Sequence, residues 1–430
     1  MKLKQRPTDF KVREILRDDV LSGKGEYRVY SVTKRKLTSL EAAEILADHA
    51  GVSAGEVALA GLKDRQGVTT QHMTIRHGRQ VRFGRPEIGI ESIGFAQQDL
   101  TSADSEGNTF EIIVRDLDER ETNRVRTALP SVREHGLPNY FDEQRFGNLR
   151  HGQGWIALDL MRGRTEVALK RLLCHVSDHD NDRTKGFKSA LFRNWGDWGT
   201  CRDVAGRFGA HHSVFEHLRR NEGDFGGAFR FIASRIRLIH LYAWQSHIWN
   251  RAVARGLENA VDEGERFAIH MREGKLLFPK GEVPADPDWE GTFPLPGPGL
   301  AGVRFERQRA LIEGVLADYD LVPDTFRIDG VPGFALKPEE RPIVLRPQNL
   351  RVRPAEPDPM SPGRKLVKLS FALPRGAYAT LVVRRLVGPP SPSSRASRGS
   401  GARGRRRGSQ RGSQRGSQRG SQRGRGPRRG

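Results

Sequence analysis

The chain has 430 residues, with 73 lysines and arginines against 52 aspartates and glutamates, and its formal net charge of +21 indicates a polyanionic partner. Its two cysteines, Cys174 and Cys201, exclude a disulfide framework and a four-thiolate zinc site, and they fit a reducing compartment. The N-terminal MKLKQRPTDF has no apolar signal core, and no apolar run approaches the roughly 18 residues of a membrane span, so we expect a cytoplasmic protein.

The first 60 residues alternate strand patterns with one helix pattern. Around Phe10–Val12 and Tyr27–Val29, apolar and polar residues alternate, which is typical of half-buried strands. Thr38 and Glu41 have the spacing of a capping box and predict an alanine-rich helix that ends near Gly51.

A tight turn between two predicted strands carries Asp64, with Lys63 and Arg65 on either side and glycines at 61 and 67. Loops held between strands often present catalytic carboxylates, and the two cations would keep Asp64 ionised and can hold phosphates. An ionised carboxylate can attack or stabilise an electron-poor sugar C1′ while a glycosidic bond breaks. The alternative is that Asp64 only caps the turn with an Asx hydrogen bond.

Further strands and a helix follow the turn. We predict strands over 57–60, 68–75, 88–95 and 109–114, and a helix over 119–135 that ends at Gly136. This pattern indicates the α+β class, with a central mixed, mainly antiparallel sheet.

Residues 136–147 form a dense run of aromatic, amide and charged side chains. Asn139 and Gln144 can read a base edge or orient a carboxylate, and Arg145 can pair with a phosphate. The rings that can stack on an unstacked base are Tyr140, Phe141 and Phe146. The alternative is a buried structural loop whose rings belong to the core.

The remainder of the chain is mainly helical before a strand returns. Helices are predicted over 166–175 and 229–255, residues 284–302 are rich in turns, and residues 365–386 form a strand, a turn and a short helix or strand. A strand that returns after a helical middle suggests an inserted domain.

From Pro389 the composition changes to a tail that contains four Gly-Ser-Gln-Arg repeats. Residues 391–430 hold 13 arginines and no acid, so we expect residues 389–430 to be disordered. The arginines either add salt-dependent affinity for RNA or belong to a solubilising extension.

Two weaker patterns carry little chemistry. His175 and His179 have helical spacing but no accompanying HExxH or CxxC, so we expect no metal site. The stretch Pro296–Gly299 lacks the Lys-Ser/Thr of a P-loop, so we expect no nucleotide hydrolysis.

Several separated segments together resemble one family, the TruD-type tRNA pseudouridine synthases. The similarity spans roughly residues 5–387 in the correct order, and such a joint match is more specific than any single motif. The segments are DFKVRE at 9–14, GLKDRQGVTTQ at 61–71, NYFDEQRFG at 139–147, AWQSHIWN at 243–250 and LPRGAYAT at 373–380.

The resemblance implies a discontinuous catalytic domain, an inserted α/β TRUD domain and a role for each matched residue. The catalytic domain would comprise residues 1–155 and 341–388, and the insertion residues 156–340. Asp64 would be the catalytic aspartate, and the uridine pocket would be lined by Phe10, Asn139, Phe141 and Tyr378. Supporting roles would fall to Glu14, Lys63, Arg65, Gln144 and Arg145.

The implied reaction is the isomerisation of a uridine in the D-arm of tRNA, at position 13, to pseudouridine. It would need no cofactor and no metal, and the enzyme would act as a monomer away from membranes. The first alternative is the same reaction on another structured RNA. The second is an RNA-binding protein without turnover on the same scaffold. A glycosidase is less favoured, because typical members need a second acid as proton donor.

Overall fold

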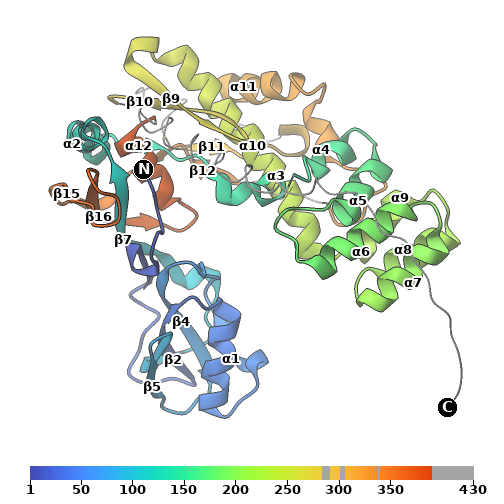
Figure 1. Cartoon of the computed structure of the whole chain (residues 1–430), viewed down its shortest axis with the longest axis horizontal. Helices are drawn as coiled ribbons and strands as arrows, with labels where there is room; N and C mark the ends of the chain where they lie inside the picture. The colour runs from blue at the N-terminus through green and yellow to red at the C-terminus, as the bar shows by residue number, and fades with distance from the viewer. Residues whose placement is uncertain (151, 283–290, 301–305, 335, 337–338, 390–430) are drawn as a thin grey trace, which may run out of the picture. The chain divides into compact units, whose positions relative to one another are not determined.

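The computed structural model describes residues 1–150, 152–282, 291–300, 306–334, 336 and 339–389 (Figure 1). The predicted disorder of the tail concerns residues that lie outside these ranges, apart from Pro389. Residues 284–290 and 301–302 of the predicted turn-rich stretch 284–302 also lie outside them. Within the described ranges, no helix combines the length and the apolar composition needed to cross a membrane.

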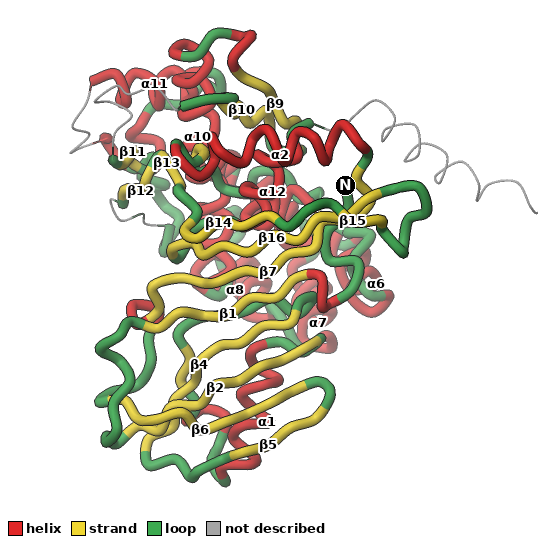
Figure 2. Tube along the Cα trace, turned by 90° about the vertical axis from the view of Figure 1, so that its left-hand side faces the viewer, coloured by secondary structure: helices red, strands yellow, loops and turns green. Residues whose placement is uncertain are grey.

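A ten-stranded sheet forms the framework of the site (Figure 2). Among the described residues, β1 and β4 form the sole parallel pair of this sheet, and the other pairs are antiparallel. The predicted α+β class with a mixed, mainly antiparallel sheet is therefore confirmed. In spatial order the strands are β14 (Gln348–Val352), β16 (Lys365–Pro374), β7 (Ser105–Leu117), β1 (Phe10–Leu16), β4 (Val68–Arg76), β2 (Tyr27–Arg35), β6 (Ile88–Ala96) and β5 (Arg82–Arg85), with β15 (Glu356–Pro357) on β16 and β3 (Ala58–Leu59) on β4.

Two capped helices accompany the sheet. In α1 (Ser39–Ala50), Thr38 and Glu41 form the predicted capping box, and the helix ends where Gly51 adopts a left-handed φ of 72°. Its alanine and leucine face packs into a core with side chains of β2, β4 and β6. The second helix, α2 (Glu119–Glu134), is capped by Asp118 and covers almost the whole predicted range.

The middle of the chain is helical, as predicted. Its longest helix, α10 (Ser234–Ala260), starts five residues later than predicted because Phe229–Phe231 form a separate 3-10 turn, and Ile232 after it is extended. The other helices are α3 (Gly147–Arg150), α4 (Ile156–Met161), α5 (Thr165–Cys174), α6 (Asp182–Arg193), α7 (Trp198–Phe208), α8 (His212–Arg220), α9 (Phe225–Ala228) and α11 (Glu306–Ala317).

Short strand pairs flank these helices. They are β9 (Arg266–Met271) with β10 (Gly274–Pro279), β11 (Thr292–Pro294) with β12 (Glu340–Pro342), and β13 (Val344–Leu345) with β8 (Leu137–Pro138). The pair of β13 with β8 brings residues 344–345 next to the start of the run at 136–147 that was singled out from the sequence.

The last described segment returns to the sheet. β16 pairs with β7, and after a turn at Gly376 the chain forms a helix, α12 (Ala379–Val387). A buried guanidinium fixes the start of the chain to this region, because Arg115 on β7 donates to Asp9 and to Asp358. The segment that precedes β1 is therefore held against the same strands as the returning segment.

Candidate active site

The turn that carries Asp64 is fixed by the parallel pairing of β1 with β4. The pairing begins where Lys11 faces Val68, immediately after the turn. A side chain at Gly67 would place a Cβ atom 2.5 Å from the carbonyl oxygen of Phe10, so this close approach requires glycine. The turn therefore lies directly against the start of β1.

Two side chains hold the carboxylate of Asp64. Lys4 Nζ lies 2.6 Å from Oδ2, and Gln144 Nε2 donates to Oδ1 over 3.2 Å. The side chain of Asp64 remains 36% exposed, so the carboxylate is oriented and still open to a substrate. In the described residues no backbone N–H donates to this carboxylate, so Asp64 does not cap its own turn.

A buried lysine holds the backbone of the turn. Lys34 on β2 is only 1% exposed, and its Nζ donates to the carbonyl oxygens of Leu37, Lys63 and Asp64 over 2.9, 3.2 and 3.0 Å. Burial lowers the pKa of Lys34 to about 8, although the carboxylates of Asp64 and Glu41 oppose this shift. Lys34 thus fixes the backbone of the Asp64 turn from the buried side.

The two cations adjacent to Asp64 in the sequence bind other groups. Lys63 Nζ lies 2.6 Å from Oε1 of the buried Glu14, and Arg65 is exposed and donates to the carbonyl oxygen of Lys36. Burial alone would raise the pKa of Glu14, but hydrogen bonds from His72 and the ammonium of Lys63 outweigh it and hold the pKa below its usual value. The ion pair of Glu14 with Lys63 therefore connects the turn to β1.

A cavity of about 380 Å³ opens beside Asp64. It brings together six of the ten predicted site residues, which are Phe10, Lys63, Asp64, Gln144, Arg145 and Tyr378. The residues Glu14, Arg65, Asn139 and Phe141 are not part of its lining. Lys4 also lines the cavity and was not identified from the sequence.

Phe141 and Asn139 lie behind the cavity wall. Phe141 is 7% exposed, and its ring centre lies 6.3 Å from that of Tyr378 at a steep angle. The buried Asn139 donates to the carbonyl oxygen of Pro342 and accepts a hydrogen bond from Arg341. Phe141 therefore contacts the ring of Tyr378, whereas Asn139 holds the segment at 341–342.

Arg341 joins the two segments of this wall. Its guanidinium lies 4.0 Å from the ring centre of Phe141 and donates to both oxygens of Asn139 and to the carbonyls of Tyr140 and Gly376. Within the described residues no carboxylate pairs with it, and burial lowers its pKa to about 10. Arg341 was not predicted from the sequence, because its partners are 35 to 202 residues away in the chain.

The lining of the cavity combines aromatic, cationic and acidic side chains. The ring of Tyr378 can face a base, whereas Phe10 is only 5% exposed and has Lys4 Nζ 4.4 Å from its ring centre. Arg145 can meet a phosphate, and Asp64 lines the same space. No group of three or more His, Cys, Asp or Glu side chains in the described ranges is arranged to hold a metal ion.

An RNA-modifying enzyme is the class that this fold and cavity define. The family model of tRNA pseudouridine synthase D (TruD) matches residues 1–386, and the chain belongs to that family, as the resemblance indicated. The protein is thus an RNA uridine isomerase.

Relatives with this assignment cover nearly the whole chain. A relative from Methanocaldococcus jannaschii is 30% identical over 90% of this chain and 91% of its own length. The tRNA pseudouridine synthase D of Aquifex aeolicus is 28% identical over 90% of this chain and 98% of its own length. A crystal structure from Methanosarcina mazei with the same assignment has a TM-score of 0.66 at 24% identity and covers 90% of this chain and 93% of that one, which supports the fold.

Proposed function

We propose that this enzyme converts a uridine in the D-arm of tRNA, at position 13, to pseudouridine, with Asp64 as the catalytic residue. The observation that carries the proposal is the carboxylate of Asp64, held between Lys4 and Gln144 at the wall of a cavity that Phe10 and Tyr378 also line. The family supplies the reaction and tRNA as the substrate class.

The uridine must leave its stack to reach Asp64. Unstacking a base costs a few kcal/mol, which contacts with the flipped nucleotide offset. Phe10 and Tyr378 would contact the uracil ring. Asn139 and Phe141 complete the proposed uridine pocket, and their burial fits a supporting place behind Tyr378.

The reaction breaks the N1–C1′ bond, turns the uracil within the pocket and joins C5 to C1′. Asp64 would assist the first step, either by attack of its carboxylate on C1′ or by removal of a ribose proton. Either route needs an ionised carboxylate at a fixed place, which the ion pair with Lys4 and the hydrogen bond from Gln144 supply. The proposed reaction uses no cofactor and no metal.

We further propose the domain division predicted from the resemblance, with 156–340 inserted between 1–155 and 341–388. Its support is that every strand of the ten-stranded sheet falls within 10–117 or 348–374. We also propose that the enzyme acts in the cytoplasm as a monomer on tRNA.

The test is to incubate the protein with an unmodified tRNA transcript and to map pseudouridine by carbodiimide labelling and primer extension. The parent protein should produce one stop in the D-arm, and Asp64→Ala and Asp64→Asn should produce none. Asp19→Ala, which changes an exposed aspartate that pairs with Arg17, is the matched control and should keep full activity.

Two outcomes would contradict the proposal. Turnover by Asp64→Ala would remove the catalytic role of Asp64. A primer-extension stop outside the D-arm would contradict the proposed position of the uridine. A stop in another cellular RNA, with no stop in tRNA, would contradict the proposed substrate. Neither result would contradict the isomerase reaction.

A further inference from the structure

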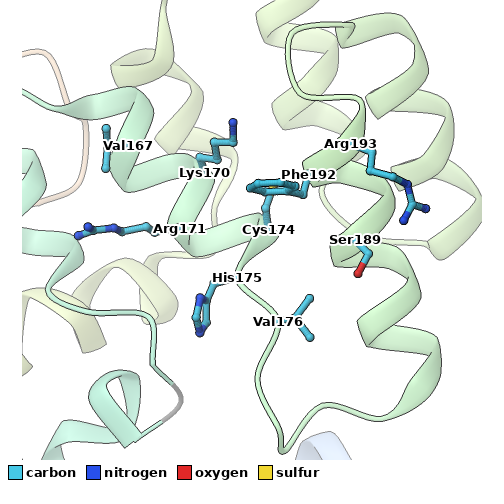
Figure 3. Close-up of a pocket in the computed structure, with 9 residues that line it drawn as sticks. All are labelled: Val167, Lys170, Arg171, Cys174, His175, Val176, Ser189, Phe192 and Arg193. Atoms are coloured by element: carbon cyan, nitrogen blue, oxygen red, sulfur yellow. The ribbon is translucent and has the colours of Figure 1, made fainter.

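A second cavity, of about 580 Å³, lies between α5 and α6 and shares no lining residue with the Asp64 cavity. Figure 3 shows Lys170 and Phe192 side by side in it, with Arg171 and Arg193 directed toward opposite ends. The reaction at Asp64 gives these side chains no role.

The cavity exposes an unusual amount of apolar surface. Phe192 is 59% exposed, as much as any large apolar side chain in the described residues, and Val167 and Val176 in the same cavity are 40% and 39% exposed. Side chains this exposed contribute little to the core. Apolar side chains that gather on a surface mark interaction sites.

The charged side chains of the cavity are cationic. Lys170 Nζ lies 5.0 Å from the ring centre of Phe192. Within the described ranges neither Lys170 nor Arg193 forms an ion pair, whereas Arg171 is neutralised by the buried Asp159. No aspartate or glutamate lines the cavity.

We propose that the α5–α6 surface (Val167, Lys170, Val176, Phe192 and Arg193) binds an unpaired nucleotide of the RNA substrate, separate from the uridine that reacts. Its base would stack on Phe192, and its flanking phosphates would pair with Lys170 and Arg193. This inference rests on the proposed tRNA substrate and adds a second contact to it.

The chemistry of the surface favours RNA over a protein partner. An exposed ring with a cation beside it is the usual platform for an unstacked base, and the ring accepts any base because every base has a π-face. A protein partner would bury the two cations, which then need carboxylates to offset their desolvation. Two phosphates meet the same requirement from one nucleotide.

The first experiment compares Phe192→Ala, Phe192→Trp and Val322→Ala. Val322 is the control, because its side chain is also 59% exposed and does not line the cavity. The Kd for a tRNA transcript is measured by filter binding, and the single-turnover rate is measured at saturating enzyme. Phe192→Ala should raise Kd by about fivefold to about a hundredfold, the range of base stacking on an aromatic ring. Its single-turnover rate should stay at the parent value, Phe192→Trp should restore the affinity, and Val322→Ala should match the parent.

A second experiment tests the phosphate contacts. The double variant Lys170→Gln, Arg193→Gln should lower the slope of log Kd against log salt by about one to two, as expected for two lost phosphate contacts. Thermal melts of all variants should match the parent, because the changed side chains are at the surface.

Three results would overturn the inference. The first is an unchanged Kd for Phe192→Ala, and the second is an unchanged salt slope for the double variant. The third is a parent dimer that Phe192→Ala dissociates without loss of tRNA affinity. This third result would assign the surface to a second copy of the chain. Failure of the proposed function is separate: a parent protein that binds tRNA but forms no pseudouridine contradicts that function, and the Kd comparison still decides the inference.

Discussion

The two walls of the Asp64 cavity are built on different principles. One wall is charged: Asp64 is 36% exposed, and its contacts are the side chains of Lys4 and Gln144. The other wall is aromatic: Tyr378 lines it, and behind this ring Phe141, which is 7% exposed, contacts both Arg341 and Tyr378. The proposed catalytic carboxylate is therefore open to a substrate and held by two side-chain contacts, whereas the surface proposed to receive the base is fixed by burial.

This difference predicts opposite effects of substitution. Ion pairs that water reaches contribute only about 0 to 1 kcal/mol to stability, so changes in the charged wall should alter the rate more than the fold. The buried guanidinium of Arg341 is the donor to its acceptors in the described residues, so its removal should affect both the stability of the fold and the reaction. Substitutions at Arg341, Lys34 and Lys4 test the comparison.

The largest effect is expected at Arg341. Arg341→Met should lower the free energy of unfolding by about 3 kcal/mol or more, because the buried oxygens of Asn139 and the carbonyls of Tyr140 and Gly376 lose their donor. It should also raise the KM for tRNA, since Phe141 and Tyr378 lose their common support. Urea unfolding and steady-state kinetics measure the two effects.

Arg385→Met is the matched control for this prediction. Arg385 is 3% exposed and donates to Lys280 and Ser131, neither of which lines the Asp64 cavity. It should lose comparable stability and keep the parent KM at a temperature where both variants are folded. Equal KM values for the two variants would mean that Arg341 has a purely structural role.

An intermediate effect is expected at Lys34, which supports the charged wall from a buried position. Lys34→Met frees the backbone of the Asp64 turn, so the single-turnover rate should fall by about tenfold to a hundredfold, as for a misplaced catalytic group. The Kd for tRNA should change little, because Lys34 is buried and does not line the cavity. A parent rate in the variant would contradict the anchoring role.

The pKa of Lys34 gives the same variant a pH signature. Burial lowers the pKa of Lys34 in the folded protein to about 8, below the ordinary lysine value of 10.5, so the unfolded chain binds more protons between about pH 8 and pH 10.5. The contribution of Lys34 to stability should therefore rise with pH across that window, by about 2 to 3 kcal/mol. Lys34→Met should lack this rise when urea unfolding is compared at pH 8 and pH 10, and parallel curves would show that Lys34 keeps an ordinary pKa.

The smallest effect on stability is expected at Lys4. Lys4→Met should change the free energy of unfolding by about 1 kcal/mol or less, yet it should lower the single-turnover rate by about tenfold or more because Asp64 loses its ion pair. Lys11→Met is the control, since Lys11 forms a similar pair with Glu111 on the exposed side of β1 and should keep the parent rate. Equal single-turnover rates for the two variants would show that Lys4 does not contribute to the reaction.

The sequence predicts the elements of this site better than the contacts between them. The capping box at Thr38, the turn at Asp64 and the returning strand at 365–374 depend on local patterns, and the structure has each of them. Lys4, Lys34 and Arg341 have no local signal, because most of their partners are 29 to 202 residues away in the chain. Lys34 alternates with its neighbours like any residue of a half-buried strand, and only the pairing of β2 with β4 brings it beneath the Asp64 turn.

The return of β16 to β7 has a consequence for synthesis. A hydrogen bond from Arg364 to Asp116 spans 248 residues, so β7 has no second neighbouring strand until β16 has been translated. At about 5 to 20 residues per second, the wait is roughly 12 to 50 s. During that time β7 is an unpaired sheet edge on the nascent chain, which is the kind of surface that aggregates with other chains. The strand that completes the sheet is therefore also the strand whose late arrival sets the period in which a chaperone is most needed.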